Sequence, residues 1–310
     1  MKRLRLSVGP ADVGDRLDRF LARAGDISRG EARRVLDRGG VWVDGKRVKA
    51  ASRAMRLNQQ VLLVLEETAA RRATPAKALE RARLLFEDAH LVAVDKPPFV
   101  ASQPTLGSDS GDLLALTQAL VARRLWLVHR LDLETSGVTI FAKSRAAVSA
   151  LTKAFRDRAV TKRYLALVSD AGSLNDEGSI DLSLSADATR PGRQKVNPHS
   201  GALALTHYRV RSRGLTGTAL VEAHPQTGRT HQIRVHLAAL GAPLLGDKLY
   251  GGPLSRALDR DESLAIPRVM LHASSLSLCH PVRDEALHIE APLPADMADI
   301  AQRLALNLPA

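Results

Sequence analysis

The sequence predicts an α+β protein of two domains. Its 310 residues are 45% hydrophobic, which is enough for a large core and corresponds to about two domains of ordinary length. The first part of the chain shows the pattern of two short helices and a hairpin. From Leu84 onward, short apolar strands are separated by turns and a few isolated helices, an order that favours α+β over a regular array of βαβ units.

The charge balance points to a polyanionic partner. The chain has 45 Lys and Arg against 33 Asp and Glu, a formal charge of +12. Nucleic acid is the first partner that such a charge suggests, and an anionic membrane surface is the second. The single cysteine, Cys279, excludes an internal disulfide and a four-cysteine zinc site, and it fits a reducing compartment. No apolar run approaches the roughly 18 residues that span a bilayer, so we expect a cytoplasmic protein with no membrane partner.

Two helices are expected near the N-terminus. Apolar residues recur at helical spacing over residues 17–24. Ser28 and Glu31 have the spacing of a capping box, which opens a second helix that stops at Gly39. This second helix carries four arginines that we predict to bind RNA: Arg29, Arg33, Arg34 and Arg38.

A hairpin should follow the helices. Asp44-Gly45 is a dipeptide typical of hairpin turns, and a strand over 61–65 closes the domain. Residues 12–60 contain 12 Lys and Arg against 7 Asp and Glu. A solvated basic face explains any single arginine cluster, but the order of helices, caps, hairpin and charge together favours RNA binding through phosphate contacts.

The remaining elements follow a linker. Residues 67–83 are polar and alanine-rich, so we expect a basic domain over 1–66, a linker over 67–83 and a larger domain over 84–310. Two strands are expected around an Asp88-Ala89 turn, followed by an amphipathic helix within residues 110–124.

The stretch VHRLDLETSGV places polar residues between two apolar segments, which predicts a strand, a tight loop and a second strand. Asp132 stands between Leu131 and Leu133, and an alternating pattern would point both leucines to the face opposite the carboxylate. A lone loop aspartate is more often a cap or turn residue than a catalyst. Here Arg130 is close enough in sequence to contact RNA or to adjust the carboxylate, and Thr135-Ser136-Gly137 supplies a hydroxyl-rich turn.

A second candidate cluster lies in TKRYLALV. Lys162 and Tyr164 are two residues apart on a predicted strand, so they share one face. An aromatic ring beside a cation suits stacking on a base, whereas the alternative is a half-buried tyrosine of the sheet.

The third cluster lies within residues 224–252. The turn from Pro225 to Gly228, with Arg229 and His231, could cradle a phosphate. The segment IRVHLAAL is expected to be a strand passing into a helix, with Arg234 near its start. The histidines of this region match no metal-site spacing, and the chain has no nucleotide-binding motif, so we expect neither a metal nor a nucleotide cofactor.

Four motifs together resemble the RluA-type family of RNA pseudouridine synthases. They are HRLDLETSG with the Lys96-Pro97 strand end, TKRY, PQTGRTHQIRVHLAALGAPLLGDKLYG and MLHASSLSLCHP. The resemblance covers about Leu84 to Pro294, and the basic segment ahead of it resembles the alpha-L (S-four-type) RNA-binding domain. It implies a pseudouridine synthase fold with a mixed, mainly antiparallel sheet.

The resemblance also implies a function. The expected reaction is a cofactor-free isomerisation in which uracil is detached from its ribose, rotated and rejoined through carbon 5. The family's catalytic aspartate falls on Asp132, its base-flipping arginine on Arg130, its stacking tyrosine on Tyr164, and the arginine that pairs with the aspartate on Arg234. The further substrate-binding residues that we predict are Lys162, Arg229 and His231.

The RNA and the alternatives stay open at this point. The resemblance implies ribosomal RNA, most of all that of the large subunit, acted on by a monomer, while transfer RNA remains a second substrate. Thr105 and the Leu133-Glu134 pair depart from the commoner family pattern, which leaves the subgroup open. A non-catalytic RNA-binding protein of the same fold and an RNA hydrolase are the rival classes.

Overall fold

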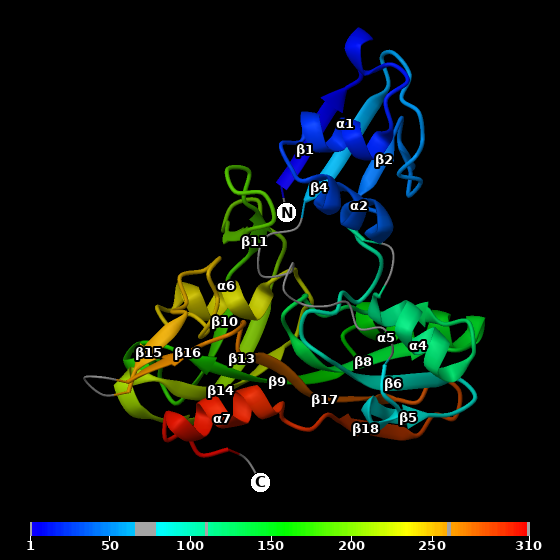
Figure 1. Ribbon diagram of the computed structural model, residues 1–310. Helices are drawn as coiled ribbons and strands as arrows, with labels where there is room; N and C mark the ends of the chain where they lie inside the picture. The colour runs from blue at the N-terminus through cyan, green and yellow to red at the C-terminus, as the bar shows by residue number, and fades with distance from the viewer. Residues whose placement is uncertain (1, 66–78, 109–110, 259–261, 309–310) are drawn as a thin grey trace. The chain divides into compact units, whose positions relative to one another are not determined.

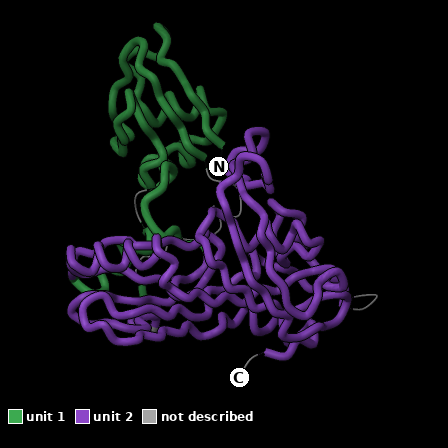
Figure 2. Tube along the Cα trace, turned by 180° about the vertical axis from the view of Figure 1, so that it is seen from behind, with its two compact units in different colours: residues 1–79, 99–122 green, residues 80–98, 123–310 purple. Residues whose placement is uncertain are grey.

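The computed structural model describes residues 2–65, 79–108, 111–258 and 262–308 of the chain. They form two compact units, Met1–Leu79 with Phe99–Ala122 and Glu80–Pro98 with Arg123–Ala310 (Figure 2). Most of the expected linker, residues 66–78, lies outside the described residues.

The first unit contains the helices and hairpin that the sequence predicts. A four-stranded antiparallel sheet of order β1-β4-β2-β3 packs against two helices. The elements are β1 (Lys2–Ser7), α1 (Leu17–Ala24), α2 (Arg29–Arg38), β2 (Val41–Val43), β3 (Lys46–Arg47) and β4 (Gln60–Leu65), with α4 (Leu113–Val121) in the later segment of this unit. Ser28 Oγ accepts a hydrogen bond from the backbone N–H of Glu31 at 3.1 Å, as the cap predicts. Strand β1 was missed, because its charged residues alternate with only two leucines.

The second unit is built on a ten-stranded sheet whose main order is β10-β13-β14-β9-β17-β8-β6-β5, with β18 beside β17 and β7 beside β8. Only the pairing of β8 with β17 is parallel among these described strands, which confirms the mixed, mainly antiparallel α+β fold. The strands are β5 (Leu84–Glu87), β6 (Leu91–Lys96), β7 (Trp126–Leu127), β8 (Ser136–Ala142), β9 (Thr161–Val168), β10 (Glu177–Asp181), β13 (Leu205–Arg213), β14 (Ala219–Pro225), β17 (Leu271–Cys279) and β18 (Ala286–Glu290).

Helices cover both faces of this sheet. Helices α5 (Arg145–Arg156) and α6 (Gln232–Ala239) lie on one side, and α7 (Ala295–Arg303) lies on the other (Figure 1). Strand β9 shows the basis for this layering, because Ala166 and Val168 pack with α6 whereas Leu165 and Leu167 pack with α7. Two hairpins, β11 (Leu184–Ala186) with β12 (Gln194–Val196) and β15 (Ser255–Ala257) with β16 (Ser263–Ala265), lie outside the main sheet.

The start of β8 is fixed by a close approach to β17. Gly137 has φ +112°, and a Cβ atom there would lie 2.2 Å from the carbonyl oxygen of Ala273. Only glycine fits this backbone contact. Ser136 and Gly137 therefore belong to the strand, so the expected Thr-Ser-Gly turn is wrong at these two positions.

Two further local expectations are corrected. Leu131 is 7% exposed but Leu133 is 40% exposed, because the segment between β7 and β8 is not extended strand and alternation does not apply there. IRVHLAAL has no strand portion, since α6 begins at Gln232. Buried residues occur around the whole helix from Gln232 to Leu237, so their sequence gives no clear helical stripe.

No helix in the described part of the chain is both long and apolar enough to cross a membrane.

Candidate active site

A cleft of about 600 Å³ opens in the second unit. It is lined by the segment between β7 and β8, the end of α5, strand β9, the turn after β14 and the start of α6. All seven residues that the sequence singled out as catalytic or substrate-binding lie along this cleft: Arg130, Asp132, Lys162, Tyr164, Arg229, His231 and Arg234. Three motifs that are far apart in sequence therefore meet at one site.

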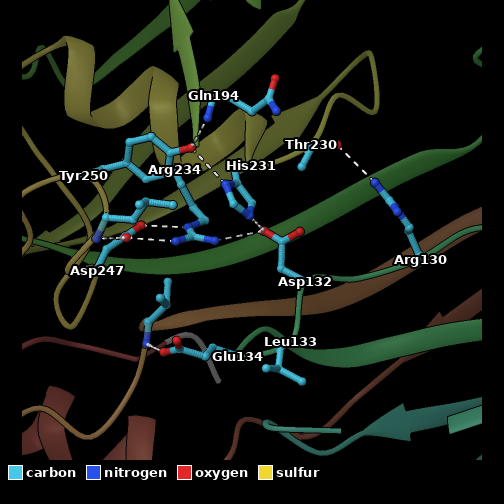
Figure 3. A network of polar contacts seen from close by, with 12 residues as sticks. Arg130, Asp132, Leu133, Glu134, Gln194, Thr230, His231, Arg234, Asp247 and Tyr250 are labelled. Atoms are coloured by element: carbon cyan, nitrogen blue, oxygen red, sulfur yellow. Dashed lines mark hydrogen bonds and ion pairs between the residues drawn. The ribbon is translucent and has the colours of Figure 1, made fainter. Parts of the chain in front are cut away.

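Asp132 is bound by Arg234, which Asp247 in turn holds in place (Figure 3). Arg234 Nη1 donates to Asp132 Oδ2 at 3.3 Å. The same guanidinium makes two hydrogen bonds to Asp247, from Nε to Oδ2 at 2.7 Å and from Nη2 to Oδ1 at 2.9 Å. Burial disfavours the charge of Arg234, but Asp247 and then Asp132 outweigh it and raise the pKa of Arg234. Arg234 is thus a permanent cation whose free nitrogen is aimed at Asp132.

One oxygen of Asp132 is left for chemistry. Oδ2 faces Arg234 and lies 3.8 Å from His231 Nε2. No described residue makes a polar contact with Oδ1, and the side chain keeps 28% exposure to the cleft. A carboxylate in this setting can act as nucleophile or proton acceptor.

His231 joins the site through an unusual backbone. It stands at the N-terminus of α6 with φ +56°, a left-handed conformation that is rare outside glycine. Its Nδ1 lies 2.8 Å from the hydroxyl of Tyr250, which also accepts a hydrogen bond from the backbone N–H of Gln194 at 2.8 Å. Burial lowers the pKa of His231, so the imidazole is neutral near pH 7.

Arg130 lies at the rim of the cleft. Its side chain is exposed, and Nη2 donates to Thr230 Oγ1 at 3.1 Å (Figure 3). This contact links the segment before β8 to the turn before α6. A single neutral partner leaves the charge of Arg130 available to RNA.

Lys162 and Tyr164 share the cleft-facing side of β9, as their spacing predicts. Lys162 Nζ donates to the carbonyl oxygen of Thr227 at 3.0 Å, and burial lowers the pKa of Lys162 to about 8. Burial also raises the pKa of Tyr164, followed by a smaller contribution from Asp132. The phenol is therefore neutral, and it lines the same cleft as the carboxylate of Asp132.

The turn after β14 is organised by a residue that the sequence analysis missed. Gln232 Oε1 accepts hydrogen bonds from Thr227 Oγ1 at 2.6 Å and from the backbone N–H of Arg229 at 3.0 Å. Arg229 Nε donates to the carbonyl oxygen of Leu203 at 3.0 Å. The amides expected to cradle a phosphate are those of the turn from Pro225 to Gly228, and that of Gln226 is already occupied, because it donates to the carbonyl oxygen of Leu205 at 2.9 Å.

Lys96 hydrogen-bonds to the segment that carries Asp132. Its side chain is fully buried, and Nζ donates to the carbonyl oxygens of Pro97 and Leu133, each at 3.1 Å. Burial lowers the pKa of Lys96 to about 7, against an opposing contribution from Asp132. The sequence places Lys96 in a motif, but no role for it was predicted from the sequence.

His129 holds the other end of the same segment. Its Nε2 accepts a hydrogen bond from the backbone N–H of Ile140 at 2.9 Å, and the ring stacks on Phe155 with centroids 4.7 Å apart. Burial, followed by the charge of Lys162, lowers the pKa of His129 to about 3. A neutral, stacked imidazole therefore anchors the chain just before Arg130.

Two of the four arginines of α2, Arg29 and Arg33, pair with a buried carboxylate in the first unit. Arg29 Nε and Arg33 Nε each contact Asp18 Oδ2, at 3.1 and 3.0 Å, and the Asp18 side chain is fully buried. Burial opposes ionisation of Asp18, but hydrogen bonds from Arg16, Arg33 and Arg29 outweigh it and lower the pKa of this carboxyl. Two of the four predicted RNA contacts are thus also structural, although Arg29 and Arg33 remain 49% and 53% exposed.

Comparison with known proteins identifies the class of enzyme. The family model for RNA pseudouridylate synthases matches residues 90–239, and that for the S4 domain matches residues 15–61. The chain belongs to the RNA pseudouridine synthase family and carries an S4 domain. It is therefore an isomerase with RNA as its partner.

Individual relatives agree with this class. The chain is 36% identical over 279 residues to the ribosomal large subunit pseudouridine synthase D of Nitrosomonas europaea, covering 86% of this chain and 79% of that one. It is 33% identical over 319 residues to the protein of the same name from Xanthomonas campestris, covering 97% and 92%. Among solved structures, human RNA Pseudouridylate Synthase Domain Containing 4 matches with a TM-score of 0.60 and 29% identity over 74% of this chain and 95% of that chain.

Proposed function

We propose that this enzyme converts specific uridines of large-subunit ribosomal RNA to pseudouridine, with Asp132 as the catalytic carboxylate. One observation carries the proposal: a carboxylate with one open oxygen stands in a cleft beside a neutral tyrosine and a fixed arginine. Relatives named for the large ribosomal subunit support the choice of RNA.

The charge of the cleft supports a polyanionic substrate. Asp132 is the only acidic residue among the residues described as lining it, and it is paired with Arg234. The basic side chains of the lining are Arg130, Arg156, Arg158, Lys162, Arg229 and Arg234. Such a surplus attracts the RNA backbone.

Three of the predicted residues then have a direct role in the reaction. A uridine stacked in RNA must be flipped out at a cost of about a few kcal/mol, and Arg130 at the rim fills the vacated space. Tyr164 stacks on the flipped ring. Asp132 Oδ1 serves as nucleophile or proton acceptor while the glycosidic bond between uracil and ribose breaks. The enclosed site keeps the freed uracil near its ribose until carbon 5 of the uracil bonds to the ribose.

The remaining parts of the proposal concern the state of the enzyme. We propose a cytoplasmic monomer that uses no metal and no nucleotide cofactor. We also propose the domains expected from the sequence, with RNA binding over 1–66 and catalysis over 84–310, whereas the compact units divide the chain at Leu79 and place Phe99–Ala122 with the first unit. The residues of α2 with exposed guanidinium groups supply phosphate contacts in the first of these domains.

Tritium release from RNA that carries 5-tritiated uridine tests the function. The intact protein should release tritium from large-subunit ribosomal RNA and not from transfer RNA. Asp132→Asn should release none while its affinity for RNA stays within about threefold, because phosphate contacts supply the affinity. Release from transfer RNA alone would contradict the substrate, free uracil as product would indicate a hydrolase, and binding without release would indicate a non-catalytic protein.

A further inference from the structure

We propose that His231 is a positioning residue for Asp132, and that Tyr250 sets the ring nitrogen on which His231 carries its proton. The inference rests on the proposed function and deepens it. It assigns a task to two side chains that line or border the cleft, and it explains which oxygen of Asp132 reacts.

The hydrogen-bond direction at Tyr250 follows from the donors around it. The backbone N–H of Gln194, on β12, can only donate, so the phenol oxygen accepts there at 2.8 Å. The phenol proton then needs an acceptor, and His231 Nδ1 lies 2.8 Å away. Burial raises the pKa of Tyr250, which keeps this proton on the phenol. The opposite arrangement would leave the hydroxyl proton without a partner in a largely buried place, which is costly.

The tautomer of His231 follows from that direction. If Nδ1 accepts from Tyr250, a neutral imidazole carries its proton on Nε2. Nε2 is the nitrogen that lies 3.8 Å from Asp132 Oδ2 (Figure 3). The other tautomer would turn an unprotonated nitrogen toward a carboxylate, so both ends of the ring favour the same state.

Burial also keeps the imidazole neutral, because it lowers the pKa of His231. The charged groups that face it are Asp132 and Asp247, which favour a second proton, and Arg234 and Arg130, which oppose it. Arg193 of the hairpin adds a further positive charge over the Tyr250 ring, with Cζ 5.6 Å from its centroid. A doubly protonated His231 would pair fully with Asp132 and compete with the substrate for the carboxylate.

The two oxygens of Asp132 have different roles. Neighbouring residues hold Oδ2 in place, and Oδ1 is available for the reaction. Arg234 and His231 both face Oδ2, Arg234 as a hydrogen-bonding cation at 3.3 Å and His231 as a neutral N–H dipole at 3.8 Å, which is longer than a hydrogen bond. They orient the carboxylate so that Oδ1 faces the nucleoside. His231 keeps this alignment without adding a second full charge, because Tyr250 occupies its other nitrogen.

A set of substitutions at the two positions tests the inference. His231→Gln keeps a side-chain N–H near Nε2 but cannot titrate, whereas His231→Leu removes the donor; both variants meet the same left-handed backbone, so the strain cancels between them. His231→Gln should retain kcat within about threefold, and His231→Leu should lose about tenfold, because the carboxylate loses the dipole that orients it. The loss should fall on kcat rather than on KM for RNA, which separates positioning of Asp132 from the substrate-binding role predicted from the sequence.

Tyr250→Phe supplies the readout that a purely structural role would not give. Without the phenol proton, Nδ1 is free to protonate, so the acid limb of the kcat profile should move to higher pH by about one unit. The double variant His231→Gln with Tyr250→Phe should show the acid limb of His231→Gln alone. Thermal unfolding and RNA affinity of each full-length variant control for folding.

The outcomes separate this inference from the proposed function. If the unsubstituted protein releases no tritium, the function itself fails. With an active unsubstituted protein, equal kcat for His231→Gln and His231→Leu would overturn the positioning role, whether or not Tyr250→Phe folds. An acid shift that persists in the double variant would overturn the role of Tyr250.

Discussion

Arg234 and Asp247 meet through two hydrogen bonds of 2.7 and 2.9 Å, and the Asp247 side chain is only 1% exposed. The same carboxylate accepts a hydrogen bond from the backbone N–H of Leu249 at 3.2 Å. The pair fixes two of the three guanidinium nitrogens and leaves Nη1 for Asp132. The alignment of Arg234 Nη1 with Asp132 therefore depends on a carboxylate that is not among the residues described as lining the cleft.

Asp247→Asn should weaken both stability and activity. The amide group would place a donor against Arg234 and remove the buried one of its two counter-ions, so we expect a loss of about 3 kcal/mol in the free energy of unfolding. Misaligned Nη1 should lower kcat by about tenfold or more. Urea unfolding and tritium release measure the two effects.

The matched control is Glu177→Gln. Glu177 pairs with Arg209 on the surface, where the side chains are 68% and 57% exposed. Loss of an exposed pair should leave stability and activity unchanged. Equal behaviour of the two variants would contradict the special place of Asp247.

Gly137→Ala should destabilise the second unit by about 3 kcal/mol or more, because it adds a steric clash with Ala273 to an unfavourable positive φ. Gly192→Ala provides the comparison, since it has φ +85° with nothing within 4 Å of the added Cβ. That variant should cost only about 1 kcal/mol. Urea unfolding of both separates the close approach from backbone strain, and equal losses would argue against the β8 and β17 contact as the cause.

His129 should make the protein sensitive to acid. Its folded pKa of about 3 lies below the ordinary value of 6.5, so the unfolded chain binds the proton first as the pH falls. The stability that neutral His129 contributes is present above pH 6.5 and is lost progressively toward pH 3. Between pH 6.5 and 4, the unfolding free energy of the unsubstituted protein should fall by about 3 kcal/mol more than that of His129→Gln.

The control for this titration is His199→Gln, because His199 is exposed. It should follow the pH dependence of the unsubstituted protein. Parallel curves for all three proteins would rule out His129 as the source of the acid sensitivity.

Substitutions of Arg34 and Arg33 on α2 should separate RNA binding from stability. Arg34→Ala should weaken RNA binding and reduce the slope of log affinity against log salt, because one phosphate contact is lost, while the unfolding midpoint stays the same. Arg33→Ala should lower the unfolding midpoint as well, because the buried Asp18 carboxylate loses a partner. Filter binding at several salt concentrations and thermal unfolding give the two readouts, and a destabilised Arg34→Ala would contradict the division.

Asp132 and Tyr164 stood out in the sequence as unusual residue types within their motifs, and the family resemblance assigned their roles together with that of Arg234. The structure brings the three residues to one cleft. The supporting residues were not recognisable, because their roles need distances that local spacing does not contain. Asp247 and Tyr250 act on residues 13 and 19 positions earlier across a bent segment.

The fold was predictable to a similar degree. Helical periodicity, caps and the Asp-Gly turn indicated the elements of the first unit, because these signals are local. Helix α6 was misread in part, since a helix that is buried on all sides carries no polar stripe. The order of strands depends on contacts between distant segments, and no local pattern predicts that β17 lies between β8 and β9.

That position of β17 has a consequence for the order in which the protein matures on the ribosome. Strand β8 follows Asp132 directly, whereas β9 and β14 belong to the part of the sheet that supports Arg234, and β17 is the strand between the two parts. Since β17 ends at Cys279, a nascent polypeptide cannot join both halves until the ribosome has passed that residue. Catalytic competence should therefore arrive abruptly when β17 emerges, after the S4 domain that precedes it in the chain has already been free to fold.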